Sequence, residues 1–182
     1  MSARGAPHHG ERAGERARLF VAATPPPEVA DALADLDRSD ERVRWAPPAT
    51  WHVTLRFLGD APIAACAGAL ATIDAPAATA HLGPRVELMF GGVVALAVAG
   101  LDDLAAAVLD TTGALVADDG RPFRGHLTLG RVRGRRGARP SLVGTPLSMV
   151  FPVDEVVLFR SDRRGGGPVV HTPVASVPLT RR

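Results

Sequence analysis

Two short segments of the chain carry the same arrangement of a histidine, an apolar residue and a threonine. The first runs Trp51-His-Val-Thr-Leu-Arg-Phe-Leu-Gly59, and the second runs Gly125-His-Leu-Thr-Leu-Gly-Arg131. An imidazole, whose pKa is ordinarily about 6.5, can donate or accept a proton at neutral pH. Two imidazoles can therefore serve as a general acid and a general base, while two hydroxyls donate to oxygens on which negative charge develops.

Both motifs lie where apolar and polar residues alternate, which is typical of a β-strand. Side chains of a strand point to opposite faces with a period of two. His52 and Thr54 are therefore expected on one face of a strand, and His126 and Thr128 on one face of another. The apolar residues between them would anchor each strand on its opposite face.

Several arginines lie close to the motifs, and the chain contains no lysine. Arg56 shares the alternation of His52, so that it either faces the same site or is a solvated charge at its rim. Strict alternation points Arg131 away from His126 unless the strand ends or contains a bulge there. The run Arg133–Arg139 is either a solvated basic loop or a contact for an RNA backbone.

Aromatic residues and the remaining histidines allow simpler interpretations. Phe20 and Trp51 could stack on a nucleobase, although packing in the core is the simpler alternative. The four other histidines lack the context of the motifs and are assigned to structure or solvent; they are His8, His9, His81 and His171.

The rest of the chain indicates one domain of the α+β class. Its 182 residues carry a net charge of +2 and a single cysteine, Cys66, which fits a reducing cytoplasm. Residues 1–15 are interpreted as a disordered leader or a misassigned start, and 16–182 as a single domain. Predicted helices cover 28–36, 63–73 and 101–117, and Gly59-Asp60 is expected to end the first motif's strand as a turn. Strands mostly in adjacent pairs favour antiparallel sheet, and no apolar stretch is long enough to cross a membrane.

The two motifs, in their order and spacing, resemble those of the two-histidine (2H) phosphoesterases. The resemblance is closest to the bacterial and archaeal RNA 2′,3′-cyclic phosphodiesterases, also known as 2′-5′ RNA ligases. It covers about residues 16–180 and includes Arg18-Leu-Phe-Val-Ala22, Pro122–Arg131 and Val157-Leu-Phe-Arg-Ser161. Trp51 and Gly125 depart from the family, which usually has a smaller apolar residue and a proline at these positions.

The resemblance implies a bilobal, pseudo-twofold symmetric fold with helices outside. Two antiparallel sheets would face each other across a central cleft, and each would contribute one His-x-Thr. It also implies that His52 gives a proton to the leaving 3′-oxygen while His126 takes one from water, leaving a 2′-phosphate. Thr54, Thr128 and Arg131 would bind the phosphate.

The resemblance implies neither a metal nor another cofactor. The expected partner is RNA with a 2′,3′-cyclic phosphate end, or a cyclic nucleotide, acted on by a cytoplasmic monomer. The reverse reaction, 2′-5′ ligation, is open to the same chemistry.

Three other interpretations remain open at this point. The substrate could be a small cyclic nucleotide or a cyclic phosphate metabolite. The chain could be a non-catalytic module that binds RNA or nucleotides. A zinc site made by the histidines is disfavoured, because no cysteine or carboxylate lies near either motif.

Overall fold

The computed structural model describes residues 14–118, 120–133, 139–163 and 169–180. The helices are α1 (Pro27–Ala34), α2 (Ile63–Leu70) and α3 (Asp102–Thr112). The strands are β1 (Arg16–Ala23), β2 (Val43–Trp45), β3 (Val53–Pro62), β4 (Ala78–Met89), β5 (Val93–Ala99), β6 (His126–Val132), β7 (Met149–Val153), β8 (Glu155–Arg163) and β9 (Val169–Pro178). No helix in these ranges is long and apolar enough to cross a membrane.

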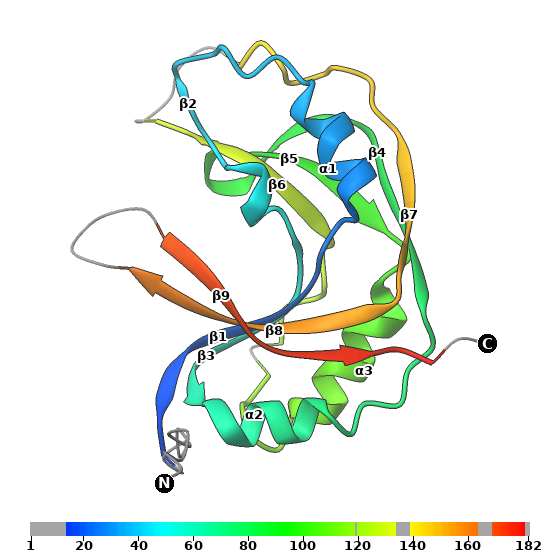
Figure 1. The fold of residues 1–182 in the computed structure, drawn as a ribbon. Helices are drawn as coiled ribbons and strands as arrows, with labels where there is room; N and C mark the ends of the chain where they lie inside the picture. The colour runs from blue at the N-terminus through cyan, green and yellow to red at the C-terminus, as the bar shows by residue number, and fades with distance from the viewer. Residues whose placement is uncertain (1–13, 119, 134–138, 164–168, 181–182) are drawn as a thin grey trace, which may run out of the picture.

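The strands form one strongly curled sheet made of two similar halves (Figure 1). Its order is β7-β4-β5-β6-β3-β1-β8-β9, with β2 paired to β6 outside this path. The halves meet where β3 and β6 pair antiparallel through Val53 and Leu127. The predicted α+β class and two-halved arrangement are confirmed. The two expected sheets are, however, joined by strand pairing rather than separate.

The two motif strands are anchored by the apolar residues that alternation predicted. Val53 and Leu55 of β3 are buried, as are Leu127 and Leu129 of β6. On the far side of β3, α2 and α3 pack against the half of the sheet that contains β1, β3, β8 and β9 (Figure 1). This packing covers the apolar face of β3 and leaves its polar face on the inner side of the curl.

A β-bulge follows the threonine of each motif. In β3, Thr54 pairs with Ala22 and Arg56 with Val21, so Leu55 is the extra residue. In β6, Thr128 pairs with Ala95 and Gly130 with Val94, so Leu129 is the extra residue. A bulge reverses the alternation of the side chains that follow it. In both strands, the side chains beyond the extra leucine therefore point to the face opposite to the one that strict alternation predicts.

Two predicted boundaries are wrong for local reasons. α3 ends at Thr112 instead of continuing to residue 117, because the residue that follows is Gly113, and glycine disfavours the continuation of a helix. Leu115, which lies beyond the end of the helix, is 40% exposed. No turn occurs at Gly59-Asp60, since β3 continues to Pro62 in register with Arg16 of β1.

The predicted leader lies mostly outside the described residues, which begin at residue 14. Glu15 is described, and its carboxylate forms an ion pair with Arg160 of β8 at 3.0 Å. The end of the predicted leader thus contacts the folded part of the chain.

Candidate active site

Each motif histidine is held by the same hydrogen bond. His52 Nδ1 lies 2.7 Å from the carbonyl oxygen of Thr50, and His126 Nδ1 lies 2.8 Å from that of Arg124. A carbonyl can only accept, so Nδ1 carries the proton in both rings. Nε2 is then the nitrogen of each ring that can gain or lose a proton.

The register of β3 and β6 brings the two motifs together. Because Val53 and Leu127 are opposite each other in an antiparallel pair, His52 is opposite Thr128 and Thr54 is opposite His126. All four side chains share one face, since each is one residue from that pair. The two histidines occupy a diagonal of this square, and such a diagonal measures about 7–8 Å in a regular ladder. The structure therefore brings both predicted histidines and both threonines to one place.

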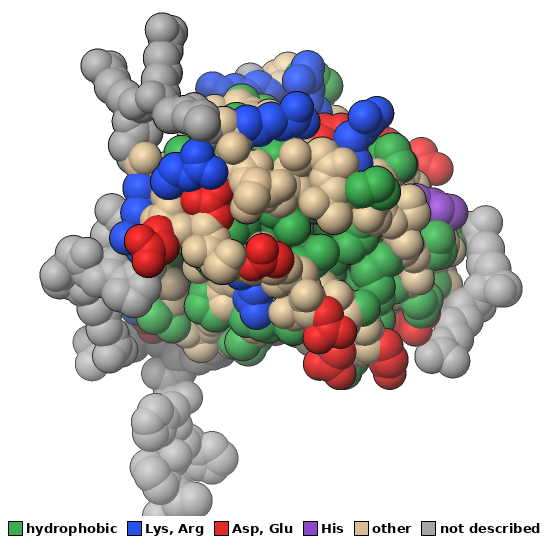
Figure 2. Space-filling view, turned by 90° about the horizontal axis from the view of Figure 1, so that it is seen from above, with side chains coloured by type: hydrophobic (Ala, Val, Ile, Leu, Met, Phe, Trp, Pro, Cys, Tyr) green, Lys and Arg blue, Asp and Glu red, His purple; other side chains and the backbone are tan. Residues whose placement is uncertain are grey.

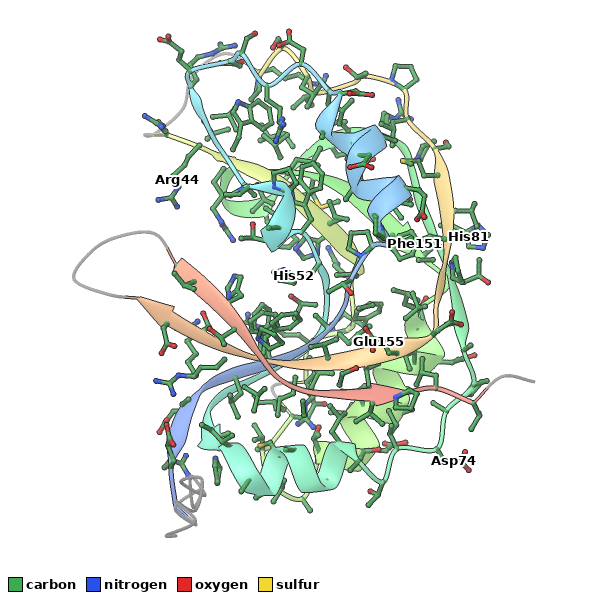
Figure 3. All side chains as sticks on the ribbon, in the orientation of Figure 1. Arg44, His52, Asp74, His81, Phe151 and Glu155 are labelled. Carbon is green, nitrogen blue, oxygen red and sulfur yellow. The ribbon has the colours of Figure 1, made fainter. Side chains whose placement is uncertain are left out.

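His52 lies on the inner side of the curl among other rings (Figure 3). Its ring centroid is 4.9 Å from that of Phe20, 6.2 Å from that of Phe159 and 5.2 Å from that of His171. Burial is the main cause that lowers the pKa of His52 to about 4; the nearby His171 and His126 act in the same direction, and the Thr50 carbonyl opposes them. Without a ligand, His52 is therefore neutral at pH 7.

His126 has a more open environment. Phe90 is the aromatic residue beside it, with an edge-to-face ring contact at 5.7 Å and 61% of its surface exposed. The two halves therefore differ, because several rings surround His52 and one exposed ring lies beside His126.

The threonine hydroxyls of the motifs are available to a ligand. Thr54 and Thr128 are both half-buried, and neither hydroxyl forms a hydrogen bond with another described residue. Hydroxyls in that state, flanking two imidazoles, can donate to the non-bridging oxygens of a phosphoryl group.

Arg56 does not share the face of His52, so that expectation is wrong. The bulge at Leu55 turns its side chain to the opposite face, where it is only 8% exposed. Its guanidinium donates to the carbonyls of Leu109, at 3.0 Å, and Val116, and to the hydroxyl of Thr112. It therefore anchors the end of α3, where a cation is favoured by the helix dipole.

The equivalent bulge at Leu129 turns Arg131 to the face that carries His126 and Thr128. After this bulge, Gly130 takes the direction of Leu129 and Arg131 takes that of Thr128. Its side chain is exposed and forms no hydrogen bond or ion pair with another described residue. Phosphate binding by Arg131 required a bulge in its strand, and β6 contains one. The corresponding position of β3 holds Phe57, which is 67% exposed.

Gly130 is needed for this arrangement because β2 lies close to it. A Cβ at Gly130 would lie 2.7 Å from a methyl carbon of Val43, 3.0 Å from the Arg44 carbonyl and 3.1 Å from the Trp45 ring. Gly125 is equally crowded, since a Cβ there would lie 2.3 Å from the Val98 carbonyl. The glycine before His126, where the family commonly has proline, therefore matches its surroundings.

His171 is a residue that sequence reasoning missed. It was assigned to structure or solvent, yet its ring is in contact with that of His52. No local sequence signal marks it, because its position depends on long-range strand pairing. β9 pairs with β8, and β8 pairs with β1, which brings His171 to His52. His81, in contrast, is exposed on β4 (Figure 3), and His8 and His9 lie outside the described residues.

The core interpretation holds for two aromatic residues that were considered for base stacking. Trp51 and Phe20 are each 3% exposed. Arg38 lies over the Trp51 ring at 5.6 Å, and Phe20 stacks on Phe159 at 5.2 Å. Phe57 and Phe90 are instead the exposed rings near the motifs.

Arginine side chains also gather at the end of the molecule that Figure 2 views from above. Arg42 forms an ion pair with Asp40 and donates to the carbonyl of Arg139 at 3.5 Å. Arg139 and Arg85 line a surface hollow of about 540 Å³, and neither motif histidine is among its lining residues. Most of the predicted basic loop, residues 134–138, lies outside the described residues.

Within the described ranges, no three His, Cys, Asp or Glu side chains are grouped as a metal site would require. The groups gathered around the motifs are imidazoles, hydroxyls and a guanidinium. These groups can transfer protons and bind anionic oxygens.

One family and several solved structures are similar to this chain. Residues 20–97 match the family described as LigT like Phosphoesterase, while no curated protein matches the chain. Escherichia coli LigT complexed with NADP+ is 26% identical with a TM-score of 0.71, over 91% of this chain and 99% of that chain. A protein of Thermus thermophilus is 26% identical with a TM-score of 0.68, over 89% of this chain and 97% of that chain.

A further structure, E. coli LigT complexed with 3′-AMP, is 24% identical with a TM-score of 0.72, over 91% of this chain and 99% of that chain. At this identity the likeness shows the shared fold. The family match over residues 20–97 and the fold shared over about nine-tenths of the chain make it similar to the LigT-like phosphoesterases of the 2H phosphoesterase superfamily.

Proposed function

We propose that the chain hydrolyses 2′,3′-cyclic phosphodiester ends of RNA to 2′-phosphomonoesters, without a metal, using His52 as proton donor and His126 as proton acceptor. The observation that supports this most directly is the equivalence of the two imidazoles. Each is fixed through Nδ1 by a backbone carbonyl, and they lie on one diagonal across the β3–β6 junction. An in-line displacement needs such a pair on opposite sides of one phosphorus.

The reaction is balanced by two proton transfers. His126 Nε2 takes a proton from water as the water oxygen bonds to phosphorus. The bond from phosphorus to the 3′-oxygen breaks, and His52 Nε2 gives its proton to that oxygen. The hydroxyls of Thr54 and Thr128, together with the Arg131 guanidinium, donate to the non-bridging oxygens as their charge grows.

The different surroundings of the two histidines favour this direction. The leaving 3′-oxygen carries the nucleoside, so the nucleoside lies on the side of the proton donor. Rings of Phe20, Phe159 and His171 surround His52, and Phe57 is exposed beside Phe20 at a ring distance of 6.2 Å. An exposed ring of this kind can stack on a base.

A proton donor with a low pKa needs help from its substrate. Burial lowers the pKa of His52 to about 4, which keeps the ring neutral in the free protein at pH 7. A phosphodiester anion beside the ring favours the protonated form and raises that pKa. Substrate binding thus charges the acid that the next step uses.

Nucleotide ligands of similar proteins support a nucleotide substrate. E. coli LigT has been crystallised with 3′-AMP, NADP+ and ATP. These ligands also favour a second candidate, a phosphodiesterase of small cyclic nucleotides, which has the same mechanism and needs no RNA contact beyond the terminal nucleotide.

The test is an assay of the full chain, in excess chelator, on an RNA oligomer that ends in a 2′,3′-cyclic phosphate. We expect a 2′-phosphate product. A 3′-phosphate product would mean that the 2′-oxygen leaves instead of the 3′-oxygen. Absence of turnover with intact binding would indicate a binding module. Parallel assays on 2′,3′-cyclic mononucleotides distinguish the second candidate, which predicts that only the small molecules react.

A further inference from the structure

A third imidazole lies beside His52 although it belongs to neither motif. His171 of β9 contacts the rings of His52, at 5.2 Å, and Phe20, at 4.9 Å, edge to face in both cases. Ser161 of β8 is its partner in the sheet, and β8 pairs with β1. His171 therefore lies on the same inner face as His52.

The two nitrogens of the His171 ring differ in their surroundings. Nδ1 is buried and has no hydrogen-bond partner in the described part of the chain, while the residue as a whole is half-buried. A neutral imidazole carries its proton on one nitrogen only, and a buried N–H without an acceptor is strongly disfavoured. The proton is therefore placed on Nε2, which makes Nε2 a donor at the open edge of the ring.

Packing alone does not explain a histidine at this position. The ring lies against Phe20, which itself stacks on Phe159, and a phenylalanine there would fill the same space without a buried, unpartnered nitrogen. A buried polar atom without a partner is destabilising, so a histidine at this position indicates a functional role that offsets the loss of stability. The open edge of the ring, beside His52, offers that role.

We propose that His171 positions the substrate by donating a hydrogen bond from Nε2 to an oxygen of the terminal nucleotide, on the side of the phosphate where His52 lies. This inference rests on the proposed function, which places the nucleoside beside His52. His171 transfers no proton in this role. Its loss therefore weakens binding and leaves the chemical step nearly unchanged.

The test compares two replacements of the same residue. His171→Phe keeps a ring and removes the donor, whereas His171→Gln places an amide N–H near the position of Nε2. We expect the Kd for 2′-AMP, measured by calorimetry, to rise about 10- to 100-fold in His171→Phe, as for loss of a hydrogen bond to a charged group. We expect it to stay within about threefold of wild type in His171→Gln. The matched control is His81→Phe, at an exposed position of β4.

On the RNA substrate, His171→Phe should raise KM by a similar factor with kcat nearly unchanged. Inorganic phosphate and adenosine, titrated separately, identify the oxygen that is bound, and a selective loss of either affinity supports the inference. Wild-type affinity for 2′-AMP in His171→Phe would overturn it. So would equal losses in both variants together with a lowered melting temperature, which would indicate a structural role.

The two proposals fail in different ways. A wild-type protein that binds 2′-AMP but never cleaves the RNA contradicts the proposed function, while the comparison of the two His171 variants by calorimetry remains decisive.

Discussion

Val53 and Leu127 are opposite each other at the junction of the two halves of the sheet, and each is followed by the threonine and preceded by the histidine of its motif. This one pair fixes the register of all four polar side chains. A shift by one residue would turn every one of them to the opposite face. The geometry of the site therefore depends on strand pairing rather than on a loop.

Replacement of either motif histidine should abolish most turnover. We expect His52→Ala and His126→Ala each to lower kcat by about 10²- to 10⁴-fold, the usual contribution of a positioned proton transfer. The double variant should be little slower than the singles, because both groups act in one step. Steady-state kinetics on the cyclic-ended RNA measures this, with His81→Ala as the control. A single variant that keeps near-wild-type kcat would contradict the assigned role of that histidine.

The pKa of His52 should depend on whether a phosphate is bound. Burial and the neighbouring His171 and His126 lower it to about 4 in the free protein. A phosphate anion favours the imidazolium, so the pKa should rise when 2′-AMP is bound. The measurement is an NMR titration of the His52 ring protons with and without saturating 2′-AMP. An unchanged pKa would mean that the bound phosphate does not lie beside this ring.

The same pKa shift should make the folded state less stable in acid. The unfolded chain protonates His52 as the pH falls through about 6.5, whereas the folded chain does so only near 4. The unfolded state therefore binds more protons between these values, and stability is lost as the pH falls from about 6.5 to 4. His52→Gln lacks this loss. Urea unfolding should show wild type losing up to about 3 kcal/mol more than the variant across this window, and equal losses would contradict the shift.

Sequence alternation could predict the face of His52 and Thr54 and of His126 and Thr128, because these residues precede the bulges. It could not predict Arg56, since the extra residue Leu55 is seen only when β3 is aligned with β1. The position of His171 depends on pairing of β9, β8 and β1, which joins segments far apart in the sequence. Local patterns therefore predicted which face the four motif side chains share, and non-local pairing decided which residues surround them.

Arg131 should contribute to phosphate binding through its charge and its paired donors. Arg131→Ala should lower kcat/KM by about 10- to 100-fold, as for a hydrogen bond to a charged group. Arg131→Lys should recover only part of this, because an ammonium lacks the planar pair of donors. Arg85→Ala, at an exposed arginine of β4 that lines the surface hollow, is the control. If it lowered kcat/KM as much as Arg131→Ala, general electrostatic attraction would explain both effects.

Arg56 should matter for stability rather than for turnover. Its buried guanidinium bonds two carbonyls and the Thr112 hydroxyl at the end of α3. Arg56→Met would leave these acceptors without a donor, so we expect a loss of about 2–4 kcal/mol in the free energy of unfolding. Arg56→Lys should lose less, since one ammonium can still reach part of this set. Below the melting transition, kcat and KM on the RNA should stay close to wild type, because the bulge at Leu55 keeps Arg56 off the face of His52. A variant that folds as stably as wild type but loses kcat would instead place Arg56 in the chemistry.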